Sequence, residues 1–188
     1  MPLGVETPAS KIATAQAVLC LTFRLSAEVI AGRIDAEIFN HEVNVFTGSS
    51  GLRLAASPES TIGDLKAGME NLTVMALSAS ALTLDETLDE VFGQLTVDKD
   101  VNRHALRVMI NQLRNAFAHN PWRAKWKIFP KYKNHYSIVL DDGSKFIFNA
   151  TSLDGQKITP EQVGGLEFWV KVLQHCERLV IHDEDRLG

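Results

Sequence analysis

Cysteine is scarce in this sequence, with only Cys20 and Cys176 among 188 residues. Two cysteines cannot form a multi-disulfide scaffold or a four-cysteine zinc site, and both lie in apolar helical patterns, which favours buried free thiols. The six histidines lack metal-ligand spacing such as His-x-x-x-His with a nearby glutamate. Also missing are a phosphate-binding loop and a G-x-S-x-G nucleophile elbow. We therefore expect neither a metal nor an organic cofactor.

Long uninterrupted apolar runs are missing as well. The two most apolar stretches, Ile12–Ala31 and Met69–Leu84, contain Arg24 and Glu70 together with many small polar residues, so neither predicts a membrane span. The first ten residues lack the basic segment and apolar core of a signal peptide. These observations predict a cytoplasmic protein with no membrane partner.

Acidic residues are absent from Val101–Leu140. The whole chain has a net charge of −4, yet this window holds 8 of its 19 lysines and arginines and none of its 23 acidic residues. The window thus carries +8 and the remainder −12, which is compatible with local recognition of an anion. The alternative is that an acidic run elsewhere in the fold neutralises the window, namely Asp85, Glu86, Asp89 and Glu90. Anion recognition by part of the window and neutralisation of another part are compatible.

The apolar spacing predicts a mainly helical chain. Its length suits one domain over residues 1–188, in which residues 1–10 form a flexible arm. A helix is expected over Ile12–Ile34, with a weak point at Gly32, and a loop from Gly48 to Pro58. Three further helices are expected from Ser60 or Thr61, around Leu84–Phe92, and from an Asp98 or Asp100 cap to about Ala118.

The spacing of apolar residues changes from helical to alternating after Pro121, and this pattern predicts a β-hairpin insertion over residues 124–150. Alternation at Tyr136, Ile138 and Leu140, a turn at 141–143 and a return over 145–148 form the hairpin, while 126–129 is expected to add a third short strand. The final helix begins near Pro160, with His175 on its exposed face. The predicted fold is an antiparallel helical bundle with a small β-hairpin inserted before the last helix.

The helix over 101–119 combines an apolar arc with a basic stripe. At about 100° per residue, Arg103, Arg107 and Arg114 share one narrow stripe, whereas Arg114 and His119 lie about 140° apart. Three arrangements could bring Arg114 and His119 to one site: unwinding before His119 at Asn120-Pro121, an arginine wrapped across the helix end, or a second subunit. The arc itself consists of Ala105, Leu106, Met109, Ile110, Leu113, Ala116 and Phe117.

The segment Arg114-Asn115-x-x-x-His119 resembles the Arg-x4–6-His motif of the HEPN superfamily, helical domains known chiefly as prokaryotic toxins and RNA-degrading modules. The resemblance covers roughly residues 100–122, and the hairpin is not part of the minimal family pattern. It implies a metal-independent endoribonuclease in which the ribose 2′-hydroxyl is the nucleophile. His119 would be the general base or acid, and Arg114 would hold the phosphate. Asn115 would orient the histidine or the scissile phosphate. It further implies a homodimer, with a toxin or defence role and an antitoxin protein as a possible partner.

The residues around the motif combine cations with aromatic rings, the ingredients of a single-strand binding surface. The candidate RNA contacts are Arg103, Arg107, Arg123, Lys125, Lys127, Trp122 and Trp126. Alternatively, the two tryptophans cover the end of the bundle and the lysines protect an edge strand from aggregation. Two other functions stay open: a HEPN-like module that binds RNA or nucleotide without cleavage, and a helical protein-interaction domain.

Overall fold

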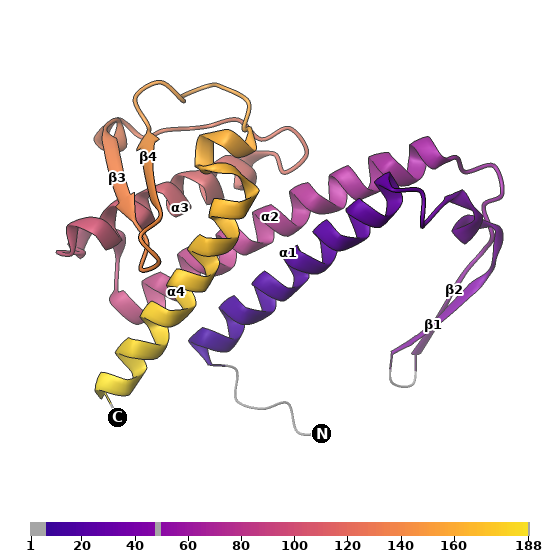
Figure 1. Cartoon of the computed structure of the whole chain (residues 1–188), viewed down its shortest axis with the longest axis horizontal. Coiled ribbons are helices and arrows are strands. Elements are labelled where there is room, and N and C mark those ends of the chain that lie inside the picture. The colour runs from indigo at the N-terminus through magenta and orange to yellow at the C-terminus, as the bar shows by residue number, and fades with distance from the viewer. Residues whose placement is uncertain (1–6, 48–49, 188) are drawn as a thin grey trace. The chain divides into compact units, whose positions relative to one another are not determined.

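The computed structural model describes residues 7–47 and 50–187, and within them the chain is mainly helical (Figure 1). Its long helices are α1 (Pro8–Ile30), α2 (Ile62–Phe92), α3 (Val101–His119) and α4 (Gly165–Leu187). The strands β1 (Val43–Thr47) and β2 (Ser50–Leu54) form one antiparallel hairpin, and β3 (His135–Val139) and β4 (Lys145–Asn149) form another. The mainly α class is confirmed, whereas a HEPN-like bundle stays a prediction.

The chain divides into two compact units. The larger unit comprises the chain up to Leu19 and from Val74 onward, and the smaller unit comprises Cys20–Thr73. Both long N-terminal helices contribute to each unit, because α1 and α2 are continuous through the boundary. The expectation of one domain over 1–188 stays a prediction.

Helix α3 provides much of the core of the larger unit. Every residue of its predicted apolar arc is buried, so the helical periodicity predicted the buried face correctly. Asp100 caps the helix by accepting a hydrogen bond of 2.9 Å from the Arg103 backbone N–H, as expected of an N-cap aspartate. Trp169 of α4 is also wholly buried, and its indole N–H donates to Ser80 of α2 at 2.9 Å.

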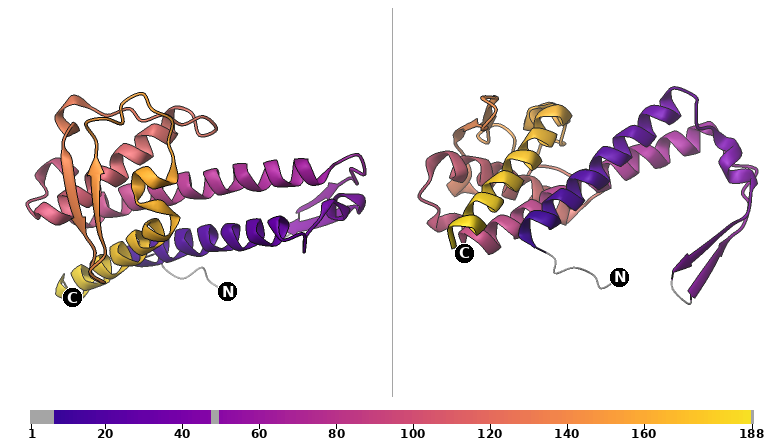
Figure 2. Two further views of the ribbon diagram at one scale, coloured as in Figure 1. Left: turned by 45° about the horizontal axis from the view of Figure 1, so that its top comes forward. Right: turned by 60° about the horizontal axis from the view of Figure 1, so that its bottom comes forward.

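The β3–β4 hairpin forms at the predicted place. Gly143 takes the positive φ of 82° that the turn requires, and the hairpin lies close to α3 in both views of Figure 2. Asn102 of α3 fixes this arrangement, because its side chain exchanges two hydrogen bonds of 2.8 Å with the Val139 backbone. The predicted third strand over 126–129 is wrong: this stretch forms no named strand, and the neighbouring Lys125 makes one isolated bridge with Lys157.

Helix α4 corrects two predictions. A short 3₁₀ turn occupies Pro160–Val163, and positive φ angles at Gly164 and Gly165 separate it from the helix, so the α-helix begins later than expected. His175 was expected on the exposed face but is buried, and its Nδ1 accepts a hydrogen bond of 3.3 Å from the Asp141 backbone. The hairpin turn covers this side of the helix, which the helical pattern alone could not indicate.

The smaller unit contains a hairpin that the sequence reading missed. Strands β1 and β2 pair Val43 with Leu54 and Val45 with Leu52 across a stretch interpreted as a loop. Alternating aliphatic residues on both sides of Gly48-Ser49-Ser50-Gly51 were the signal that would have predicted it. Residues 48–49 lie outside the described residues.

Helix ends account for the remaining differences. α1 ends at Ile30 rather than Ile34, because Gly32 adopts a φ of 69° just beyond the last turn. α2 begins after Thr61, as predicted, and continues without a break to Phe92, so the separate acidic helix over 84–92 is wrong. α1 already begins at Pro8, which corrects the predicted arm for residues 8–10; residues 1–6 lie outside the described ones.

Among the described helices, α1 is long and apolar enough to cross a membrane by length and composition. Core helices of soluble proteins and signal sequences satisfy the same criterion. Within α1, Ile12, Leu19 and Val29 are buried, whereas Leu21 and Ile30 are exposed, and 22% of the apolar stretch of the helix is buried in the folded chain.

Candidate functional site

Two arginines of the basic stripe on α3 are bound to carboxylates of the fold, and one of them, Arg107, is buried. Arg107 has 2% of its side chain exposed and donates to Asp98 at 2.8 Å, to Asp89 at 2.5 Å and to the Gly93 carbonyl. Arg103 forms a bidentate salt bridge with the same Asp98 carboxylate at 2.8 and 2.9 Å, and its guanidinium lies over the Phe92 ring. Both were candidate RNA contacts, and this is corrected: their guanidinium groups are engaged in the fold.

Asp98 explains why a helix with two arginines one turn apart is stable. Burial opposes ionisation of this carboxyl, but the hydrogen bonds from Arg103 and Arg107 outweigh it and hold the pKa at about 2. Asp89 adds a second acidic partner from α2. The acidic run therefore neutralises part of the basic window, as the alternative interpretation proposed, through residues that lie outside the window in sequence.

Arg114 belongs to a polar network between α2 and α3. Its Nη1 donates to Asn115 at 3.0 Å, Asn115 donates to Asn111 at 3.1 Å, and Asn111 donates to Asp85 at 3.0 Å. Arg114 Nε lies 3.7 Å from Asp85 and makes no hydrogen bond within the described part of the chain. Burial raises the pKa of Asp85 above its usual value, although the Asn111 bond opposes this. The side chain of Arg114 is thus oriented but still 37% exposed.

His119 is exposed and is the last residue of α3. The helix stays regular up to this residue and ends at the C-cap Asn120, so unwinding before His119, one of the three arrangements considered, does not occur. Arg114 borders Asp85 of α2, whereas His119 lines a hollow formed with the segment after the helix. Within one chain, the two motif residues therefore lie at separate places.

The hollow beside His119 has a volume of about 490 Å³ and is cationic. Arg123, Lys125 and Lys127 line it together with His119, and Trp126 and Ala116 contribute its apolar part. None of these three cations forms an ion pair with any residue in 7–46 or 50–183, the ranges whose side chains the structure describes. Unlike the two arginines paired with Asp98, these side chains are available to an anion.

The segment from Arg123 to Phe129 alternates between solvent and core. Arg123, Lys125, Lys127 and Phe129 are exposed, whereas the residues between them are buried: Ala124, Trp126 and Ile128. Trp126 is 1% exposed, donates to Gln162 at 2.8 Å and packs against Phe148, so its predicted role as an RNA-stacking ring is corrected. Trp122 is 58% exposed and keeps that role as a candidate.

Lys157 is a cation that the sequence reading missed. It forms an isolated antiparallel bridge with Lys125, which lies 32 positions earlier in the sequence, and both lysines are exposed. Its own segment carries no motif. Alternation around Lys157 could have indicated an extended stretch, but nothing in the sequence predicted which residue it would face.

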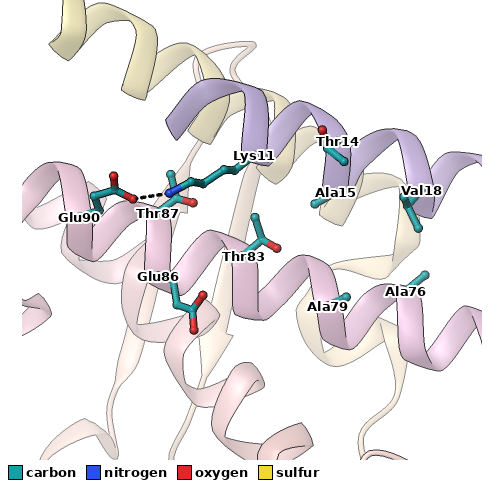
Figure 3. A pocket seen from close by; sticks show the side chains of 10 residues that line it. All are labelled: Lys11, Thr14, Ala15, Val18, Ala76, Ala79, Thr83, Glu86, Thr87 and Glu90. Carbon is teal, nitrogen blue, oxygen red and sulfur yellow. Dashed lines mark hydrogen bonds and ion pairs between the residues drawn. The ribbon is translucent and has the colours of Figure 1, made fainter. Parts of the chain in front are cut away.

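A second hollow lies between α1 and α2 of the larger unit, with a volume of about 360 Å³ (Figure 3). Small and hydroxyl-bearing residues such as Ala15, Ala79 and Thr83 line it, and its charged residues are Glu86 and the pair Lys11–Glu90 at 2.8 Å. Its balance of charge is acidic, so a polyanion would be repelled from it. The hollow beside His119 is therefore the candidate site.

Within residues 7–46 and 50–183, no group of three or more His, Cys, Asp or Glu side chains is arranged to hold a metal ion. Comparison with protein-family models, with curated proteins and with solved structures found no match to this chain. Its function is therefore argued from its own residues.

Proposed function

We propose that this protein is a metal-independent endoribonuclease of the HEPN type. The observation that carries the proposal is the hollow beside His119, where an exposed imidazole borders Arg123, Lys125 and Lys127. Cations without acidic partners attract a phosphodiester, and an imidazole in reach of the ribose can act as a general acid or base. Exposed Trp122, close by in sequence, offers a ring on which an unpaired base can stack.

The proposed reaction uses groups of the protein and the substrate. His119 removes the proton from a ribose 2′-hydroxyl, or donates one to the departing 5′-oxygen, and such catalysis contributes roughly 10²–10⁴-fold. The 2′-oxygen attacks the adjacent phosphorus and the bond to the 5′-oxygen breaks, which leaves a 2′,3′-cyclic phosphate. Arg114 stabilises the charge that builds on the phosphate oxygens, and Asn115 holds the guanidinium at 3.0 Å.

For Arg114 and His119 to act on the same phosphate, two copies of the chain are needed. Arg114 and His119 of one chain lie apart, and α3 is regular between them. A homodimer in which Arg114 of one copy approaches His119 of the other completes the site without distorting the helix. A toxin or defence role and an antitoxin partner follow from the HEPN resemblance and belong to this proposal.

A second candidate function is RNA binding without cleavage. The pairing of Arg114 with Asp85 favours it, because a carboxylate 3.7 Å from Nε offsets the charge that would otherwise meet a phosphate. In this case the cationic hollow holds RNA and His119 contributes only to binding.

One experiment separates the two candidates. Purified protein and its His119→Ala variant are incubated with labelled RNA in excess EDTA. Cleavage with 2′,3′-cyclic phosphate ends, lost in the variant, supports the ribonuclease. Salt-sensitive RNA binding without cleavage overturns the ribonuclease in favour of the binding module. Absence of both overturns the two RNA functions together.

A further inference from the structure

Lys125 and Lys157 form the closest kind of side-chain pair that an antiparallel ribbon allows. The Ala124 carbonyl accepts a hydrogen bond from the Ile158 N–H at 3.2 Å, and the Trp126 N–H donates to the Gln156 carbonyl at 2.9 Å. These bonds flank the lysine pair, so it is a non-hydrogen-bonded pair, in which the Cα atoms are only about 4.5 Å apart. Side chains paired in this way point to the same face.

Two like charges directly opposite each other destabilise a ribbon unless something neutralises them. Neither lysine forms an ion pair within the described part of the chain. The acidic residue nearest in sequence to Lys157 is Asp154, which accepts a hydrogen bond from the Ile128 backbone and pairs with Lys133 at 2.8 Å. The pair is therefore a concentrated positive charge that an external anion would relieve.

The neighbouring cations extend this charge along a line. Arg123, Lys125 and Lys127 are exposed at alternate positions of one short segment and line the same hollow. Several cations on one segment, none of them with an acidic partner in the described part of the chain, suit a ligand with repeated charges better than a single small anion. Exposed Trp122 at the start of the line can stack on a base only where that base is unpaired.

We infer that Lys125 and Lys157 together hold a backbone phosphate of a single-stranded nucleic acid, whose neighbouring nucleotides follow Arg123 and Lys127. The inference rests on the proposed function and deepens it by assigning Lys157 as a binding residue and a single strand as the substrate class. RNA and DNA share the phosphodiester chemistry that the lysines recognise, so both are tested.

The test uses the full chain carrying His119→Ala, so that cleavage does not consume the probe. Fluorescence anisotropy measures binding of a labelled single-stranded RNA, a DNA of the same sequence and the corresponding duplex at increasing salt. Lys125→Ala and Lys157→Ala should each weaken single-strand binding regardless of sequence and reduce the salt slope by about 0.7. Lys66→Glu, at an exposed lysine of the smaller unit, is the matched control and should leave binding unchanged.

Lys157→Glu separates binding from folding. It replaces a like-charge pair with an opposite-charge pair, so the melting temperature should rise or stay constant while single-strand binding falls further than with Lys157→Ala. Single-strand binding that is insensitive to both lysines overturns the inference. So does equal affinity for the duplex, or equal affinity for polyglutamate, which would indicate an acidic protein partner.

The outcome is distinguishable from failure of the proposed function. Lysine-dependent single-strand binding by a wild-type protein that does not cleave RNA keeps the inference and overturns the ribonuclease. Cleavage of RNA that is unaffected by Lys157→Glu keeps the ribonuclease and overturns this inference.

Discussion

Arg107 Nη1 lies 2.8 Å from Asp98 Oδ2, and both side chains are hidden from solvent. The pair joins the middle of α3 to the segment that precedes the helix, and Arg103 binds the same carboxylate from one turn earlier. The basic stripe resembles an RNA-binding surface in the sequence, but two of its arginines, Arg103 and Arg107, are engaged in an ion cluster within the fold.

Arg107→Met is expected to destabilise the protein by about 1–3 kcal/mol, because Asp98 and Asp89 lose the hydrogen bonds of the guanidinium while Arg103 still pairs with Asp98. Urea unfolding measures the change. Arg123→Ala removes an exposed arginine without an ion pair in the described chain and should alter the free energy of unfolding by less than about 0.5 kcal/mol. Equal effects of the two substitutions would contradict the assignment of Arg107 to the interior.

The Asp98 cluster predicts a pH dependence with a defined sign. The pKa of Asp98 falls from 3.8 to about 2 on folding, so its contribution to stability is complete above its unfolded pKa. That contribution is lost as the pH falls through about 2. Asp98→Asn should thus be less stable than the wild type at about pH 5, and the difference should shrink as the pH approaches 2. A difference that is constant over this range would contradict the predicted shift.

The two neighbouring tryptophans should behave in opposite ways. Trp126→Ala empties a buried position and should cost roughly 3–5 kcal/mol of folding free energy. Trp122→Ala should leave the melting temperature nearly unchanged and weaken single-strand RNA binding by about 1–3 kcal/mol, the usual effect of losing a stacked base. Calorimetry and anisotropy on both variants check this. Loss of RNA binding by a fully folded Trp126 variant alone would contradict the placement of the two rings.

A mixing experiment tests whether the ribonuclease site is shared between copies. Arg114→Ala and His119→Ala should each be inactive alone. After the two are unfolded and refolded together, mixed dimers contain one site with both residues intact, so part of the cleavage should return. Light scattering confirms that dimers form. Dimers that form but remain inactive would contradict a site built from Arg114 of one copy and His119 of the other.

The sequence by itself determined the local elements. The buried arc of α3, its Asp100 cap and the turn around Gly143 follow from periodicity, capping and backbone conformation, each set by residues only a few positions apart. The sequence also determined that one segment is strongly cationic. The alternation of aliphatic residues in β1 and β2 could also have predicted their hairpin, which the sequence analysis did not include.

Only the tertiary structure decided which cations are available to a ligand. Arg107 is neutralised by Asp89 and Asp98, and Trp126 packs against Phe148. Lys157 pairs with Lys125, which lies 32 positions earlier in the sequence. Each of these outcomes depends on a contact between distant parts of the chain. Helical or strand periodicity fixes which face a side chain occupies, but not what that face meets, so burial and charge pairing at the candidate site emerge only when the chain has folded.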